Sequence, residues 1–211
     1  MQRKHLFPLG IVLALALLTV AIEDYPGGTQ FDAHSTGFDW KQNYLCNLFS
    51  ATAINGAVNT ARSWAICGWL FMCMSFCWFY IDFSRKIPVR SSALIIRYGG
   101  VAGMLCAWLA VTPFHDGAIT AALCFNMIAV LYMLIFVLKS KRTALKILGI
   151  VLMVIAYTTA AFYYTRFHLE MLPTLQKATV LAFLSWFLWL HYFTDREDFT
   201  PPGFTNTSIR S

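Results

Sequence analysis

The sequence predicts an all-α membrane protein built as a bundle of six transmembrane helices. Hydrophobic residues make up 58% of the 211-residue chain and charged residues only 12%, whereas soluble domains average roughly half apolar and a quarter charged. The apolar residues are gathered into blocks of about the length that crosses a bilayer. Such blocks have to be helical, because in hydrocarbon only a helix satisfies its backbone N–H and C=O groups within one segment.

Each apolar block gives one predicted span. The spans cover residues 6–22, 64–81, 93–113, 118–138, 147–164 and 178–193. We predict one membrane domain over residues 1–194, followed by a flexible cytoplasmic tail at 195–211.

The first block has an alternative interpretation. Basic residues precede it and the apolar run is short, as in a cleavable signal peptide, with Thr19 and Ala21 as the small residues before the cut. Cleavage would leave five spans with their orientations unchanged.

The distribution of basic residues predicts the orientation. Four of the 16 Lys and Arg residues fall on the predicted outer side, namely Lys41, Arg62, Arg166 and Lys177. The other twelve fall on or near the inner side, and an excess of Lys and Arg marks the cytoplasmic face. We therefore predict a multi-pass protein with both termini in the cytoplasm. The net charge of +6 reflects this topology, and no basic, aromatic-rich face outside the membrane suggests a nucleic-acid partner.

The first outer connection, residues 23–63, is much longer than the others. Long connections in compact proteins usually serve a function. Turns are predicted at Tyr25–Gly28 and at Asn55-Gly56, which contain the residues that turns prefer. We expect this connection to form an outer cap.

Within this cap, residues 40–49 predict a short helix along the outer surface. Asp39 precedes it and can cap the first-turn amides. Trp40 would lie on an apolar face, and Asn43 and Asn47, four residues apart, on another. The cap is expected to meet membrane lipid or a membrane-protein partner.

Several titratable residues on the predicted outer side suggest an alternative function. If the cap folds back over the bundle, His34, His115 and His168 could bind zinc, which needs three protein ligands and an open position for water. The metal would activate that water as a nucleophile. His115 and Asp116 are the catalytic candidates, since the Asp116 carboxylate could orient the histidine or take a proton. This alternative is a metal-dependent hydrolase acting on a lipid-like substrate at the outer face. Against it, the three histidines lie on separate segments.

The leading interpretation is a non-enzymatic accessory, sensing or lipid-associated protein, and zinc is implied as a cofactor only by the hydrolase alternative. A small transporter is a third alternative, but the middles of the predicted spans carry no ionisable residues of the kind that mark ion pathways. Gly99 and Gly103 instead predict close helix packing, and Asn126 predicts a hydrogen bond between helices.

The chain resembles a group of bacterial membrane proteins described as domain of unknown function 998, within the wider Frag/DRAM/Sfk group. The residues that carry the resemblance are Tyr25–Gly28, the stretch from Gly37 to Asn47, and Pro113–Asp116. The resemblance extends over most of the chain. It implies a six-helix bundle in the bacterial inner membrane and brings no assigned activity.

Overall fold

The protein was analysed as a computed structural model that describes residues 5–200. Within this range the regular structure is helical, and only two isolated β-bridges occur. The long helices are α1 (Leu6–Glu23), α2 (Arg62–Ser84), α3 (Arg90–Leu109), α4 (His115–Lys139), α5 (Thr143–Thr165) and α6 (Leu172–Phe193). Two short 3₁₀ helices are η2 (Leu45–Phe49) and η3 (Arg196–Phe199).

Five of these helices, α1 to α5, are long and apolar enough to cross a membrane. This confirms the prediction of an all-α protein with several apolar helices of spanning length. The sixth helix, α6, has 22 residues but is not among the five, and it carries Gln176, Lys177 and His191. The sixth span therefore stays a prediction.

The helix boundaries differ from the predicted ones by up to six residues, and two of these differences involve a proline. The predicted span 93–113 ends early, at Leu109, because Pro113 disfavours helical backbone at the residue before it. The last helix begins at Leu172, earlier than the predicted residue 178, and Pro173 lies in its first turn, where proline is well tolerated.

The first residues of the predicted flexible tail form regular structure. Residues 196–199 form η3, and Phe199 is buried against Phe83, with 5.5 Å between the ring centroids. Aromatic burial of this kind orders the chain just after α6. The rest of the predicted tail, 201–211, lies outside the described residues.

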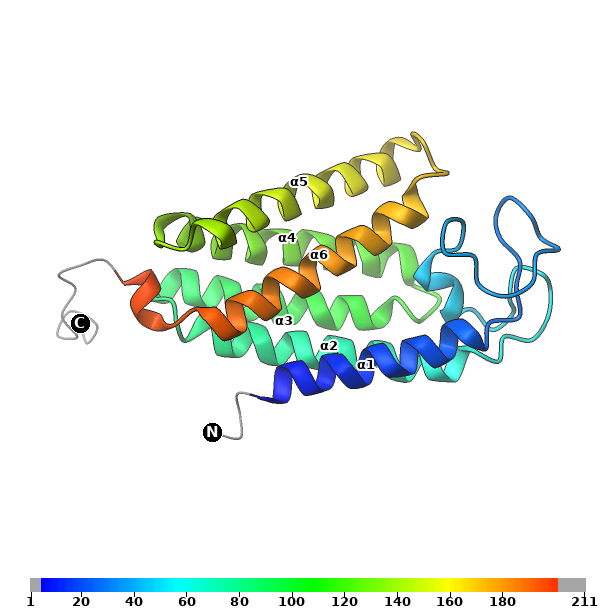
Figure 1. Ribbon diagram of the computed structural model, residues 1–211, viewed down its shortest axis with the longest axis horizontal. Helices are drawn as coiled ribbons and strands as arrows, with labels where there is room; N and C mark the ends of the chain where they lie inside the picture. The colour runs from blue at the N-terminus through cyan, green and yellow to red at the C-terminus, as the bar shows by residue number, and fades with distance from the viewer. Residues whose placement is uncertain (1–4, 201–211) are drawn as a thin grey trace.

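The helices run side by side along the long axis of the molecule (Figure 1). Helices α1 to α4 pack against their neighbours in chain order, and α5 and α6 pair as a hairpin. The long connection, residues 24–61, lies at one end together with the α3–α4 and α5–α6 turns. The α2–α3 and α4–α5 turns and η3 lie at the other end, which we call the basic end.

An aromatic cluster fills the bundle in the half toward the basic end. The rings of Phe79 and Phe187 stack with centroids 4.6 Å apart, which joins α2 to α6. Phe7 of α1 adds a third ring 5.1 Å from that of Phe79. All three side chains are almost fully buried, so aromatic burial holds α1, α2 and α6 together at this end.

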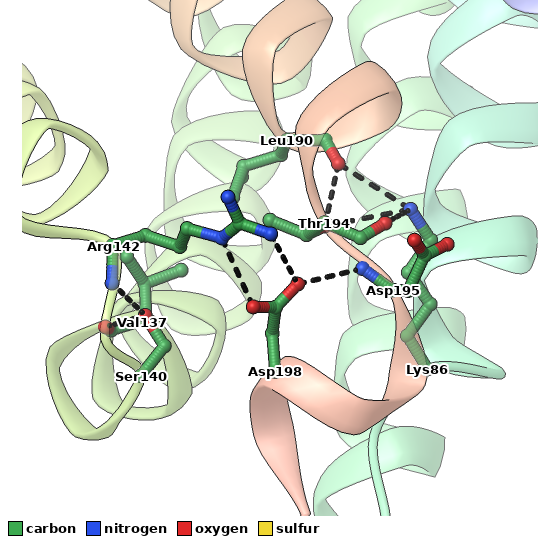
Figure 2. Close-up of polar contacts among 8 residues, drawn as sticks. All are labelled: Lys86, Val137, Ser140, Arg142, Leu190, Thr194, Asp195 and Asp198. Carbon is green, nitrogen blue, oxygen red and sulfur yellow. Dashed lines mark hydrogen bonds and ion pairs between the residues drawn. The ribbon is translucent and has the colours of Figure 1, made fainter.

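Polar contacts fasten the same end (Figure 2). The Lys86 ammonium donates to the carbonyl oxygen of Thr194 at 2.8 Å and to that of Leu190 at 3.3 Å. It thereby satisfies carbonyls that the end of α6 leaves without helical partners. The Arg142 guanidinium forms an ion pair with the Asp198 carboxylate at 3.0 Å, so η3 is tied to the α4–α5 turn.

The pKa of Asp198 reflects these contacts. Burial of the carboxyl group raises its pKa, but the hydrogen bonds from Arg142 and from the Asp195 N–H outweigh burial and leave the pKa below its usual value. Asp198 therefore stays ionised at neutral pH and keeps its ion pair.

A hydrogen bond between helices confirms the expectation for Asn126. The Tyr80 hydroxyl of α2 donates to Asn126 Oδ1 of α4 at 2.9 Å. Helix α3 lies against both residues through glycines, since a Cβ atom at Gly100 would overlap the Tyr80 ring and one at Gly103 would overlap the Asn126 amide. The predicted close packing thus involves Gly103 and Gly100, whereas Gly99 makes looser contacts.

Candidate functional site beneath the long connection

Buried asparagines hold the long connection in shape. The Asn59 amide donates to the carbonyl oxygens of Leu48 at 3.1 Å and Ser50 at 2.8 Å. The fully buried Asn43 amide donates to the Gly28 carbonyl at 2.8 Å. These side chains replace the backbone pairing that a sheet or helix would supply, so a segment with little regular structure satisfies its buried carbonyls.

The predicted helix over residues 40–49 is only partly formed. The Asp39 carboxylate accepts from the backbone N–H groups of Lys41 and Gln42, as expected of a cap. The helix stops after that turn because the Tyr44 N–H, which would continue it, donates to the Asn47 side chain at 2.7 Å instead. Side chains of this type compete with the backbone for hydrogen bonds. A separate 3₁₀ helix, η2, then follows.

The N-terminal turns of α6 hold the long connection in place. The Lys177 ammonium donates to the Asn43 carbonyl and to the Pro173 carbonyl, each at 2.7 Å. The Gln176 side-chain oxygen accepts from the Leu45 N–H at 2.9 Å. Charge-assisted hydrogen bonds such as those of Lys177 are among the stronger polar contacts in proteins. The connection is therefore docked on α6 as well as on its own two helices.

A cavity of about 670 Å³ lies beneath this docked segment, inside the half of the bundle nearest the long connection. Its walls come from five of the long helices. Representative lining residues are Leu18 of α1, Met72 of α2, Leu123 of α4, Ala160 of α5 and Leu184 of α6, with Cys46 and Phe49 contributed by the connection. The wall is mainly apolar, and its size falls within the range of small-molecule binding sites.

Charged and polar groups line the cavity near the ends of the helices. They include His115 and Asp116 at the start of α4, Arg166 just after α5, and Lys177 near the start of α6. His115 Nδ1 and Asp116 Oδ1 lie 3.0 Å apart, and the Asp116 side chain is 87% exposed. The cavity is thus amphipathic, with an apolar interior and a charged rim.

The titratable groups that the connection contributes to the wall are uncharged. Burial raises the pKa of the Cys46 thiol to about 11, and burial is also the main cause that raises the pKa of Tyr44. A thiol with such a pKa is a poor nucleophile at neutral pH, because the thiolate is the reactive form. Cys46 therefore contributes an uncharged side chain to the cavity wall.

The three predicted metal-binding histidines are not brought together. Among residues 5–200, no three His, Cys, Asp or Glu side chains are grouped closely enough to hold a metal ion. His168 instead pairs with Glu170, with Nδ1 and Oε1 2.7 Å apart, and this hydrogen bond lowers the pKa of Glu170. His34 is exposed on the connection. Zinc needs three protein ligands at one point, so the described arrangement does not support the zinc site, which stays a prediction.

Of the four residues predicted to form the surface of the cap, two stabilise its backbone and two also line the cavity. Asp39 and Asn43 stabilise the turn, as described above, and the Asn47 carboxamide oxygen accepts from the Tyr44 N–H at 2.7 Å. Asn47 also contributes to the cavity wall. Trp40 is 59% exposed, stacks edge-on against Phe38 and reaches the cavity rim.

Arg166, Gln176 and Lys177 are the site residues that sequence reasoning assigned no role. Arg166 and Lys177 were counted only as outer positive charges, and they lie near opposite ends of the α5–α6 turn. The sequence signal that could have identified them is that two cations flank one short outer turn, on the side of the membrane where basic residues are scarce.

The chain matches no known protein family, no curated protein sequence and no solved structure. The cavity, its apolar wall and its charged rim are therefore the features that bear on function.

Proposed function

We propose that this protein is a six-span membrane protein that holds the acyl chain of an amphipathic lipid in the cavity beneath the long connection. The observation that carries the proposal is the apolar cavity of about 670 Å³ with charged groups gathered at one end. An acyl chain would bury its surface against the apolar wall, and a polar headgroup would reach the rim.

The difference between the two halves of the bundle supports this function. Large aromatic side chains fill the half toward the basic end. In the other half, small residues such as Ala156 and Ala160 line the wall of α5. Protein interiors are otherwise closely packed, and an apolar chain would fill this partly open space between the helices.

The proposed topology places the cavity in the outer leaflet. Arg85, Lys86, Lys141 and Arg142 lie in the two turns at the basic end, which by the excess of positive charge faces the cytoplasm. Helix α6 would be the sixth span, with Gln176 and Lys177 near the outer interface. The long connection would then be an outer cap over the lipid.

Filling the cavity should prevent lipid retention. Ala160 lines the cavity, so we expect Ala160→Trp to place an indole where the acyl chain lies. Native mass spectrometry of the detergent-purified protein should show lipid bound to the wild type, and less than about one tenth as much bound to this variant, because losing 1.4 kcal/mol of binding already costs a factor of ten.

The neighbouring alanine provides a matched control. Ala161 is exposed and does not line the cavity, so Ala161→Trp should retain lipid like the wild type. Equal lipid content in the three proteins, all folded by circular dichroism, would refute the proposal. Metal analysis of the same samples tests the hydrolase alternative, which requires stoichiometric zinc.

A further inference from the structure

We infer that the ligand is a glycerophospholipid taken from the surrounding bilayer between α1 and α6, with its phosphate held by Arg166 and Lys177. This inference depends on the proposed function and extends it to the headgroup and the access route. Its three grounds are an opening toward lipid, a partly buried cation that forms no ion pair with the described residues, and a second cation at the same rim.

The opening is indicated by residues that line the cavity and also face outward. Leu15 of α1 is 41% exposed and Leu181 of α6 is 62% exposed, yet both contribute to the cavity wall. The two helices meet near the basic end, where the rings of Phe7 and His191 lie 5.3 Å apart. Toward the connection the two helices diverge (Figure 1), and both contribute residues to the cavity wall. An opening bordered by leucines at membrane depth admits an acyl chain from the bilayer.

The charge of Lys177 is only partly compensated by the protein. Lys177 is partly buried in the cavity rim, and no carboxylate of residues 5–200 lies within 4.0 Å of its ammonium group. Two carbonyl oxygens and the Phe38 ring, with its centroid 5.8 Å away, are its direct partners. The Asp39 carboxylate lies near enough to feel its charge but forms no ion pair with it among the described residues. A partly buried cation is stabilised by an anion, and the third ammonium proton can donate to one.

Arg166 adds a second cation to the same rim. Asp116 is the one carboxylate that lines the cavity. It is bound to His115 at 3.0 Å, and its side chain points largely to water. Although Asp116 lies near enough to feel the charge of Arg166, the described residues form no ion pair between the two. The planar guanidinium of arginine suits bidentate binding of a phosphate.

The backbone of Arg166 points to a role for its side chain. Its φ angle is +57°, in the left-handed region at the end of α5, where glycine is the usual residue. A non-glycine residue there carries a conformational cost. The substitution Arg166→Gly should therefore remove the charge while preserving the turn.

The test compares two lipids that differ in phosphate. We would titrate the detergent-solubilised protein with dioleoylphosphatidylglycerol or with dioleoylglycerol, which has the same chains and no phosphate, and measure apparent Kd by native mass spectrometry. We expect phosphatidylglycerol to bind at least about tenfold more tightly, the size of one charge-assisted hydrogen bond. In Arg166→Gly the ratio of the two apparent Kd values should fall by about tenfold. The thermal unfolding midpoint of this variant should be unchanged or raised.

Lys177→Gln should also reduce the preference, and Lys41→Gln is its matched control, since Lys41 is exposed and does not line the cavity. Equal affinity for the two lipids, or an unchanged preference in Arg166→Gly, would overturn the inference. Binding of sn-glycerol 3-phosphate as tight as that of the phospholipid would overturn the bilayer source. Lipid loss in Ala160→Trp together with equal affinities would retain the cavity function and reject only the headgroup assignment.

Discussion

Gly100→Ala is expected to destabilise the protein by about 1–3 kcal/mol, the range for overpacking a well-packed core. The new methyl group would overlap the ring of Tyr80. That ring is fully buried, lies 5.7 Å from the Phe187 ring and donates a hydrogen bond to Asn126 at 2.9 Å. It therefore has no nearby space into which to move. The measurement is the thermal unfolding midpoint of the purified protein in detergent.

The adjacent glycine is the control for this prediction. A Cβ atom at Gly99 would lie 3.6 Å from the Phe125 carbonyl oxygen and 3.7 Å from Ala129 Cβ, which are ordinary contacts. Gly99→Ala should therefore change stability by no more than about 0.5 kcal/mol, as for tolerated substitutions. Similar midpoints for both variants would contradict the packing of α3 against Tyr80.

Asn59→Ala should loosen the long connection and lower the free energy of unfolding by about 2–3 kcal/mol, since a buried polar group that loses its partner costs about 1–3 kcal/mol. The Asn59 amide donates hydrogen bonds to the carbonyl oxygens of Leu48 and Ser50, and its side-chain oxygen accepts from the Ala61 N–H at 3.2 Å. Hydrogen exchange should rise across residues 45–61, because these backbone groups open first.

Asn55→Ala is the comparison for Asn59. Asn55 makes a similar side-chain contact, to the Pro26 carbonyl at 3.0 Å, but at an exposed position, where water can replace the lost bond. Its effect should be below about 1 kcal/mol. If the two variants lost equal stability, the buried asparagine would not be the scaffold of the connection.

The sequence was informative wherever the signal was local. Apolar blocks identified the helices, Pro113 explains the early end of α3, and the turn at Asn55-Gly56 forms as predicted, with Gly56 at φ +86°. Asn126 was predicted to bond another helix because a polar side chain among apolar neighbours needs a partner. Its partner, Tyr80, could not be named, since residues far apart in the chain give no periodic signal.

The candidate site depends on contacts between distant segments, and this limited its prediction. Asp116, Arg166 and Lys177 come together through the packing of α4, α5 and α6, and Cys46 joins them through the docking of the connection on α6. A metal site was predicted at the histidines only because histidine is a common zinc ligand. In the structure two of them pair with a carboxylate one or two residues away, and such local pairing competes with a shared metal site.

Photolabelling with a phosphatidylglycerol that carries a diazirine in its acyl chain would show whether a lipid chain occupies the cavity. We predict that labelled peptides identify cavity-wall positions such as Leu123 on α4, Ala160 on α5 and Leu184 on α6, and that Ala160→Trp abolishes this labelling. Labelling confined to outward-facing residues such as Val154, unchanged in Ala160→Trp, would show that lipid only surrounds the protein and would contradict the account.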